Sequence, residues 1–201
     1  MNRNVSPSLV YAAALVLAAC SLLYELLIAQ TLATLAANTV VWYSVTIGLY
    51  LAAMGLGALL HEKFATGNLW ARLFRVELLL SAAGALAVPI LHFSHTCALL
   101  LELNDLTLAS NVLFFGSAFV LIAVIGMLTG FELPLLIDLG NAASSEKRVT
   151  NRVLASDYMG SLLGGLAFPL VLMPNLGLIV IGAIKPGTPI NVVIIPNSFK
   201  R

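Results

Sequence analysis

The sequence predicts an all-α protein, a polytopic bundle of about five transmembrane helices. Of its 201 residues, 60% are hydrophobic and only 9% are charged, with a mean hydropathy of +1.01. A soluble domain carries charge on about a quarter of its residues. Between Arg3 and Glu62 the only formally charged residue is Glu25. That stretch is long enough for two membrane crossings of about 20 residues each.

Five apolar runs, separated by charged or turn-forming residues, mark the expected helices. They cover residues 8–36, 40–60, 76–93, 112–137 and 158–183. The segment 97–110 is apolar and then polar, and it is too short for a full crossing, so it is expected to form an interfacial or re-entrant piece and bring the total to six at most. The expected organisation is a helical bundle over residues 1–183 followed by a short polar or extended tail over residues 184–201.

The basic residues predict the orientation of this bundle. Lys and Arg are absent from the expected first and third loops, and they occur at the N-terminus, in the second loop and in the fourth loop, at Arg3, Lys63, Arg72, Arg75, Lys147, Arg148 and Arg152. Basic loops stay in the cytoplasm. We therefore expect a multi-pass protein of the cell inner (cytoplasmic) membrane with a cytoplasmic N-terminus. The net charge of +1 offers no basic face for nucleic acid.

Small residues recur at a spacing of four within three of the expected helices. The pairs are Ala53 with Gly57, Gly126 with Gly130, and Gly160 with Gly164. Such pairs let helix backbones approach closely in lipid. They predict a tightly packed bundle, and plain packing within the chain is favoured over a specific dimer face.

Four acidic residues lie in or at the start of the expected helices, namely Glu25, Glu77, Glu132 and Asp157. A charged side chain at the centre of a bilayer costs about 2.5–3.5 kcal/mol on insertion scales, so each acid is a candidate functional residue. The expected topology brings Glu77, Glu132 and Asp157 to the same side of the membrane. The alternative is that these acids pair with Arg72, Arg75 or Arg152 at the interface.

Three prolines are expected to break helices in the same region: Pro134, Pro169 and Pro174. Each lacks an N–H group, which leaves the carbonyl four residues earlier without its helical partner. Freed carbonyls beside carboxylates line cation sites in some transporters. The alternative is that the prolines only kink their helices.

Cysteine and histidine give no reason to expect a metal or another cofactor. Cys20 and Cys97 are far apart in the sequence, and His92 and His95 have no accompanying ligand motif. Leu17-Ala18-Ala19-Cys20 has the form of a bacterial lipoprotein cleavage box. The apolar run continues beyond Cys20, which favours a spanning helix over lipidation of that cysteine.

Several strings follow one another in an order typical of one bacterial family. They are Tyr24-Glu25-Leu26-Leu27, Thr46-Ile47-Gly48-Leu49 running to Met54-Gly55-Leu56-Gly57, Val76-Glu77-Leu78-Leu79, Gly130-Phe131-Glu132-Leu133-Pro134-Leu135-Leu136, Ser156-Asp157-Tyr158-Met159-Gly160 and Phe168-Pro169-Leu170. Over residues 10–178 the chain resembles the N-terminal membrane region of membrane-bound spermidine synthase homologues, the polyamine aminopropyltransferases.

The resemblance implies a cytoplasmic Rossmann-like domain after the bundle, which would bind decarboxylated S-adenosylmethionine and transfer its aminopropyl group to putrescine. After Leu178 the sequence contains neither a Gly-rich cofactor loop nor an acidic residue. No catalytic residue can therefore be assigned, no cofactor is expected, and the chain is not expected to be an enzyme on its own. The tail is expected to be a truncated or frameshifted end, or a docking segment.

Three functional hypotheses follow. The favoured one is a membrane module acting as an anchor or assembly partner, with a separately encoded catalytic subunit as one partner. The second is polyamine or cation binding or transport through an intramembrane site made by Glu132, Glu77 and Asp157, with Glu25 as a further candidate. The third is an accessory subunit of a larger membrane complex, recruited through the small-residue faces.

Overall fold

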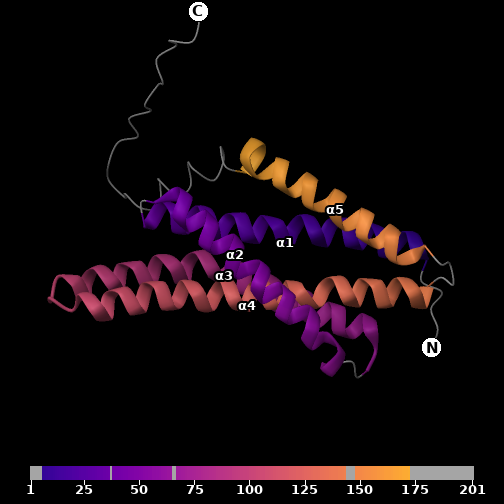
Figure 1. Ribbon diagram of the computed structural model, residues 1–201, viewed down its shortest axis with the longest axis horizontal. Helices are drawn as coiled ribbons and strands as arrows, with labels where there is room; N and C mark the ends of the chain where they lie inside the picture. Colours follow the sequence, from indigo (N-terminus) through magenta and orange to yellow (C-terminus); the bar gives the residue numbers. More distant parts are fainter. Residues whose placement is uncertain (1–5, 37, 65–66, 144–147, 173–201) are drawn as a thin grey trace, which may run out of the picture. The chain divides into compact units, whose positions relative to one another are not determined.

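The computed structural model describes residues 6–36, 38–64, 67–143 and 148–172, and every regular element in these ranges is helical. The tail over 184–201, Pro174, Arg3 and Lys147 lie outside the described residues. The elements are α1 (Pro7–Leu35), α2 (Thr39–Leu60), the 3-10 turn η1 (His61–Phe64), α3 (Leu69–Glu102), α4 (Thr107–Ala143), α5 (Val149–Ala167) and the π-helical segment η2 (Phe168–Leu172) (Figure 1). Five of the described helices are long and apolar enough to cross a membrane. The expected fold class is therefore confirmed.

Local chemistry explains where several helices begin. Pro7 occupies the first turn of α1, where a missing N–H breaks no helical hydrogen bond. Asparagine side chains cap the next two long helices. Asn38 accepts a hydrogen bond from the backbone N–H of Val41, and Asn68 accepts one from that of Trp70.

The third helix is longer than the expected 76–93. Its polar segment after residue 91 remains helical because side chains there bond to the backbone of their own helix. His92 Nδ1 lies 3.0 Å from the carbonyl oxygen of Val88, and Thr96 donates to that of His92. Hydrogen bonds of this kind satisfy polar groups inside an apolar helix. The expected end at residue 93 was therefore wrong.

The expected interfacial or re-entrant segment over 97–110 is not a separate element. Residues up to Glu102 belong to α3, and α4 begins at Thr107. The connecting turn contains Asp105 in the left-handed region with φ of 61°, a conformation that Asp adopts more readily than most residues. Ser110 Oγ donates to Glu102 Oε1 at 3.1 Å across this turn. The two long helices therefore form one antiparallel hairpin.

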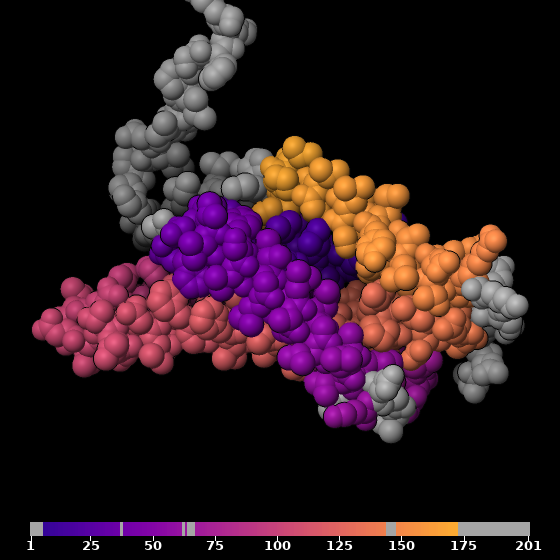
Figure 2. All heavy atoms as spheres, in the orientation of Figure 1, coloured from indigo at the N-terminus to yellow at the C-terminus, as the bar shows by residue number. Residues whose placement is uncertain are grey.

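Helix α2 crosses α4, as Figures 1 and 2 show, and glycines lie where the two helices meet. A Cβ atom added to Gly57 would lie 2.2 Å from the carbonyl oxygen of Met127, and one added to Gly130 would lie 2.1 Å from that of Met54. No side chain fits at either position. The expected close approach through these glycines is confirmed, and it occurs within the chain.

Helix α5 lies against α1 through the third small-residue pair. A Cβ on Gly160 would lie 2.0 Å from the carbonyl oxygen of Leu15, and one on Gly164 would lie 2.7 Å from that of Ala19. All three predicted pairs therefore serve contacts between helices of this chain.

Candidate functional site

Glu132 is the most deeply buried of the predicted acids. Glu132 is 3% exposed, and it lies on the face of α4 that meets α1. Ser21 Oγ lies 2.7 Å from Glu132 Oε2, to which it donates a hydrogen bond. The other oxygen, Oε1, is buried without a hydrogen-bond partner. An unmet acceptor in so buried a place is costly, which makes Glu132 the centre of the candidate site.

A layer of hydroxyl groups lies beside this carboxyl group. Tyr50 of α2 donates to Thr129 Oγ1 at 2.9 Å, and Thr129 donates to the carbonyl oxygen of Ile125 at 3.0 Å. The Tyr50 hydroxyl also lies 3.4 Å from the carbonyl oxygen of Ser21. Side chains of α1, α2 and α4 therefore meet in one polar cluster inside an otherwise apolar bundle.

Glu77 and Asp157 lie near enough to Glu132 for direct charge–charge interaction. Both are half-buried, and Glu77 Oε1 is buried without a hydrogen-bond partner. The structure therefore brings together the three acids that the topology was expected to place on one side. Their positions within the helices differ from expectation, since α3 begins at Leu69 and α5 at Val149. Neither acid stands at a helix start.

Glu25 belongs to the same region. It lies one turn after Ser21 on α1, is 7% exposed, and interacts electrostatically with the Tyr50 hydroxyl. All five long helices therefore contribute at least one residue to the candidate site, which consists of the four acids, Tyr50, Ser21 and Thr129.

The expected alternative of interfacial ion pairs does not apply to two of the three arginines. Arg72 is buried and points a guanidinium nitrogen at the carbonyl oxygen of His61, and Arg75 donates to that of Ala71. Both arginine side chains therefore interact with backbone carbonyl groups instead of the acids.

Pro134 does not break its helix as expected. Helix α4 continues through Pro134 to Ala143, so no break occurs there. One missing N–H removes one hydrogen bond from a 37-residue helix, which kinks a helix more readily than it ends one. The carbonyl of Gly130 still lacks its helical donor. Pro169 lies in η2, the π-helical segment that follows α5.

Sequence reasoning missed Ser21, the hydroxyl partner of Glu132, and the nearby hydroxyl of Thr129. Ser21 precedes Glu25 by four residues and Thr129 precedes Glu132 by three, so each pair shares a helix face. That spacing was the available signal. The contact between Ser21 and Glu132 joins residues 111 positions apart, and no local pattern reveals it.

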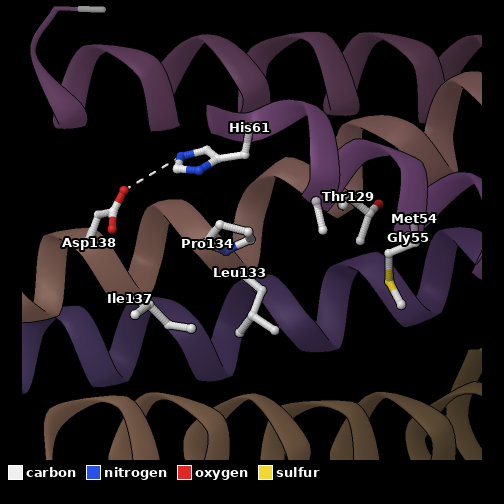
Figure 3. Close-up of a pocket in the computed structure, with 10 residues that line it drawn as sticks. Met54, Gly55, His61, Thr129, Leu133, Pro134, Ile137 and Asp138 are labelled. Atoms are coloured by element: carbon white, nitrogen blue, oxygen red, sulfur yellow. Dashed lines mark ion pairs between the residues drawn. The ribbon is translucent and has the colours of Figure 1, made fainter. Parts of the chain in front are cut away.

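A second polar feature lies in a partly open cavity of about 580 Å³ between α2 and α4, which Thr129 of the cluster also lines. Most of its lining is apolar, with His61 and Asp138 at one end. Figure 3 shows these two side chains facing each other, with His61 Nε2 3.6 Å from Asp138 Oδ2. This groove was not predicted.

Metal coordination finds no support in the described ranges. No group of three His, Cys, Asp or Glu side chains there converges closely enough to hold an ion. Cys20 lies in the middle of α1, and Cys97 lies in α3. Both are half-buried and have free thiols.

Several curated proteins resemble this chain, and they share one name. This chain is 31% identical over 175 residues to a polyamine aminopropyltransferase of Leptospira interrogans. It is 34% identical over 180 residues to polyamine aminopropyltransferase 2 of Ralstonia nicotianae, and 38% identical over 168 residues to a polyamine aminopropyltransferase of Mycobacterium tuberculosis. These matches cover 87%, 89% and 81% of the chain, but only 32%, 32% and 30% of the relatives. The chain thus spans about a third of the length of these relatives. No family model and no solved structure matches it.

Proposed function

We propose that this chain is an integral membrane module of a polyamine aminopropyltransferase-type protein and acts as an anchor or assembly partner. The observation that carries the proposal is that the segment shared with these relatives contains five helices apolar enough to cross a membrane. The candidate site adds buried carboxyl groups but no cofactor-binding loop.

The test is an assay of aminopropyl transfer with the purified chain, run beside a full-length relative. The relative is expected to turn over and the chain to give no signal above background. Clear turnover by the chain alone would reject the proposed role.

The proposed location is the cell inner membrane, with the N-terminus in the cytoplasm. Support comes from Lys63, which follows α2, and from Arg72 and Arg75 near the start of α3, at the opposite end of that helix from the turn at Leu103. Lys63 and Leu103 are both exposed. Single cysteines at these positions, in a chain without Cys20 and Cys97, provide the test. An impermeant maleimide added to intact cells should label position 103 only, and labelling of position 63 would reverse the orientation.

A second function, binding of a polyamine or another cation, is favoured by the unpartnered Oε1 of Glu132. A buried carboxyl group with two further acids nearby offers acceptors to an ammonium group. The name of the relatives makes a polyamine the first ligand to try. Labelled spermidine should bind the solubilised chain and bind Glu132→Gln at least tenfold more weakly, about the effect of one charged hydrogen bond.

Glu102→Gln is the matched control for this experiment, because Glu102 is an exposed acid at the hairpin turn. It should bind spermidine like the parent chain. Equal binding by the parent chain and by Glu132→Gln would reject the acid cluster as the site.

The third hypothesis is an accessory subunit recruited through small-residue faces, and the three small-residue pairs are not free for such a contact. All three pairs contact helices of the same chain. Such a subunit would have to bind its complex through other residues.

A further inference from the structure

The groove between α2 and α4 carries two polar side chains at one end, the imidazole of His61 and the carboxylate of Asp138. His61 is 6% exposed, and its Nε2 is buried without a hydrogen-bond partner. Asp138 lies opposite with a side chain that is 47% exposed. Their separation of 3.6 Å is too long for a hydrogen bond. Each group can therefore still take a partner of its own.

The backbone holds His61 in this position. It opens η1 directly after α2, and its carbonyl oxygen lies 3.4 Å from the guanidinium of the buried Arg72. Asp138 lies five residues before the end of α4. The polar end of the groove is thus near helix ends, where lipid headgroups lie when the helices cross a bilayer.

Apart from the buried Thr129, the rest of the groove is lined by apolar or small residues. Gly55 and Ala58 are exposed, and Leu133, Pro134 and Ile137 are half-buried. A Cβ atom on Gly55 would meet nothing within 4 Å. Around five membrane-crossing helices, the hydrocarbon that reaches such walls is an acyl chain.

We infer that this groove binds an aminophospholipid, with its primary ammonium on Asp138, its phosphate on His61 Nε2 and an acyl chain along Leu133 and Ile137. A zwitterionic headgroup satisfies both polar groups at once, because a carboxylate accepts from an ammonium and an imidazole N–H donates to a phosphate. Phosphatidylcholine has no N–H to donate, and phosphatidylglycerol has no ammonium. The groove shares Thr129 with the Glu132 cluster, but its polar end is made by His61 and Asp138, which are not part of that cluster.

Native mass spectrometry of the full chain, with equal amounts of phosphatidylethanolamine, phosphatidylcholine and phosphatidylglycerol, tests the inference. The parent chain should retain phosphatidylethanolamine about tenfold more than phosphatidylcholine, the effect expected of one charged hydrogen bond. Asp138→Asn should lose this preference. Asp105→Asn should keep it, because that acid is exposed and Asn tolerates its positive φ.

A lipid series gives a readout that needs no variant. Ethanolamine headgroups with no, one, two or three N-methyl groups should bind alike until the last N–H is lost and then about tenfold more weakly. Equal retention of phosphatidylethanolamine and phosphatidylcholine would overturn the inference, as would an unchanged preference in Asp138→Asn. Displacement of the lipid by spermidine at an equal concentration would assign the groove to a free amine instead.

Discussion

Replacing Gly130 by alanine tests the crossing of α2 and α4 most directly. The added Cβ would lie 2.1 Å from the carbonyl oxygen of Met54 and 3.0 Å from the backbone nitrogen of Ala58. Both are backbone atoms, so no rotamer change relieves the clash. Helix α2 must move by about 0.9 Å before the contact with Met54 reaches 3.0 Å, the shortest distance that real Cβ atoms show. Overpacking of this kind costs about 1–3 kcal/mol.

The assay is unfolding of the chain in mixed micelles at increasing mole fraction of dodecyl sulfate, followed by circular dichroism. Gly116→Ala is the matched control, since Gly116 belongs to the same helix and a Cβ there meets nothing within 4 Å. Alanine is the better helix former, so the control should equal the parent chain or gain up to about 1 kcal/mol. If Gly130→Ala is as stable as Gly116→Ala, the described crossing is wrong.

Three further substitutions probe the polar contacts with the same unfolding assay. Ser21→Ala should destabilise by about 1–3 kcal/mol, because it leaves both oxygens of a buried carboxyl group unpartnered; a loss below 0.5 kcal/mol, roughly the smallest net value of one hydrogen bond, would argue against that contact. Tyr50→Phe should cost less, about 0.5–1.5 kcal/mol, since its acceptor on Thr129 keeps a bond to backbone; a larger loss than in Ser21→Ala would contradict this order. Ser110→Ala should lose about 1 kcal/mol or less, because its bond to Glu102 is only partly buried; unfolding of the whole hairpin would show that the turn depends on it.

Composition and small-residue spacing were enough to predict much of the fold. Five apolar runs gave five helices, and Gly57, Gly130 and Gly160 were correctly expected at close backbone approaches. Both signals, the apolar runs and the small-residue spacing, are local in the sequence. Membrane insertion depends on the hydrophobicity of each segment, and close helix packing requires a residue with little or no side chain. The ends of the helices were harder to predict. Polar residues such as His92 and Thr96 resemble a loop in a hydropathy scan but bond to their own helix.

The candidate site was predictable only in part, for a physical reason. Acids in apolar helices are visible in the sequence because each is costly there, and Glu77 and Asp157 each lie near enough to Glu132 for their charges to interact with it. The partner that satisfies Glu132 is a serine on α1, and serine is common enough in membrane helices to attract no notice. The groove at His61 and Asp138 depends on the crossing of two helices, which single-helix patterns do not encode.

The length of the α3–α4 hairpin has a consequence for its place in a bilayer. Its helices contain 34 and 37 residues, or about 51 and 56 Å at 1.5 Å per residue, against a hydrocarbon layer of about 30 Å. The turn end carries the exposed polar residues Asn104 and Asp105 beside Leu103 and Leu108, which are 82% and 84% exposed. In a bilayer, helices of this length would either tilt or extend beyond the hydrocarbon layer at their polar ends. A hairpin that crosses a bilayer without tilting would therefore place its polar turn, with Asn104 and Asp105, outside the hydrocarbon layer.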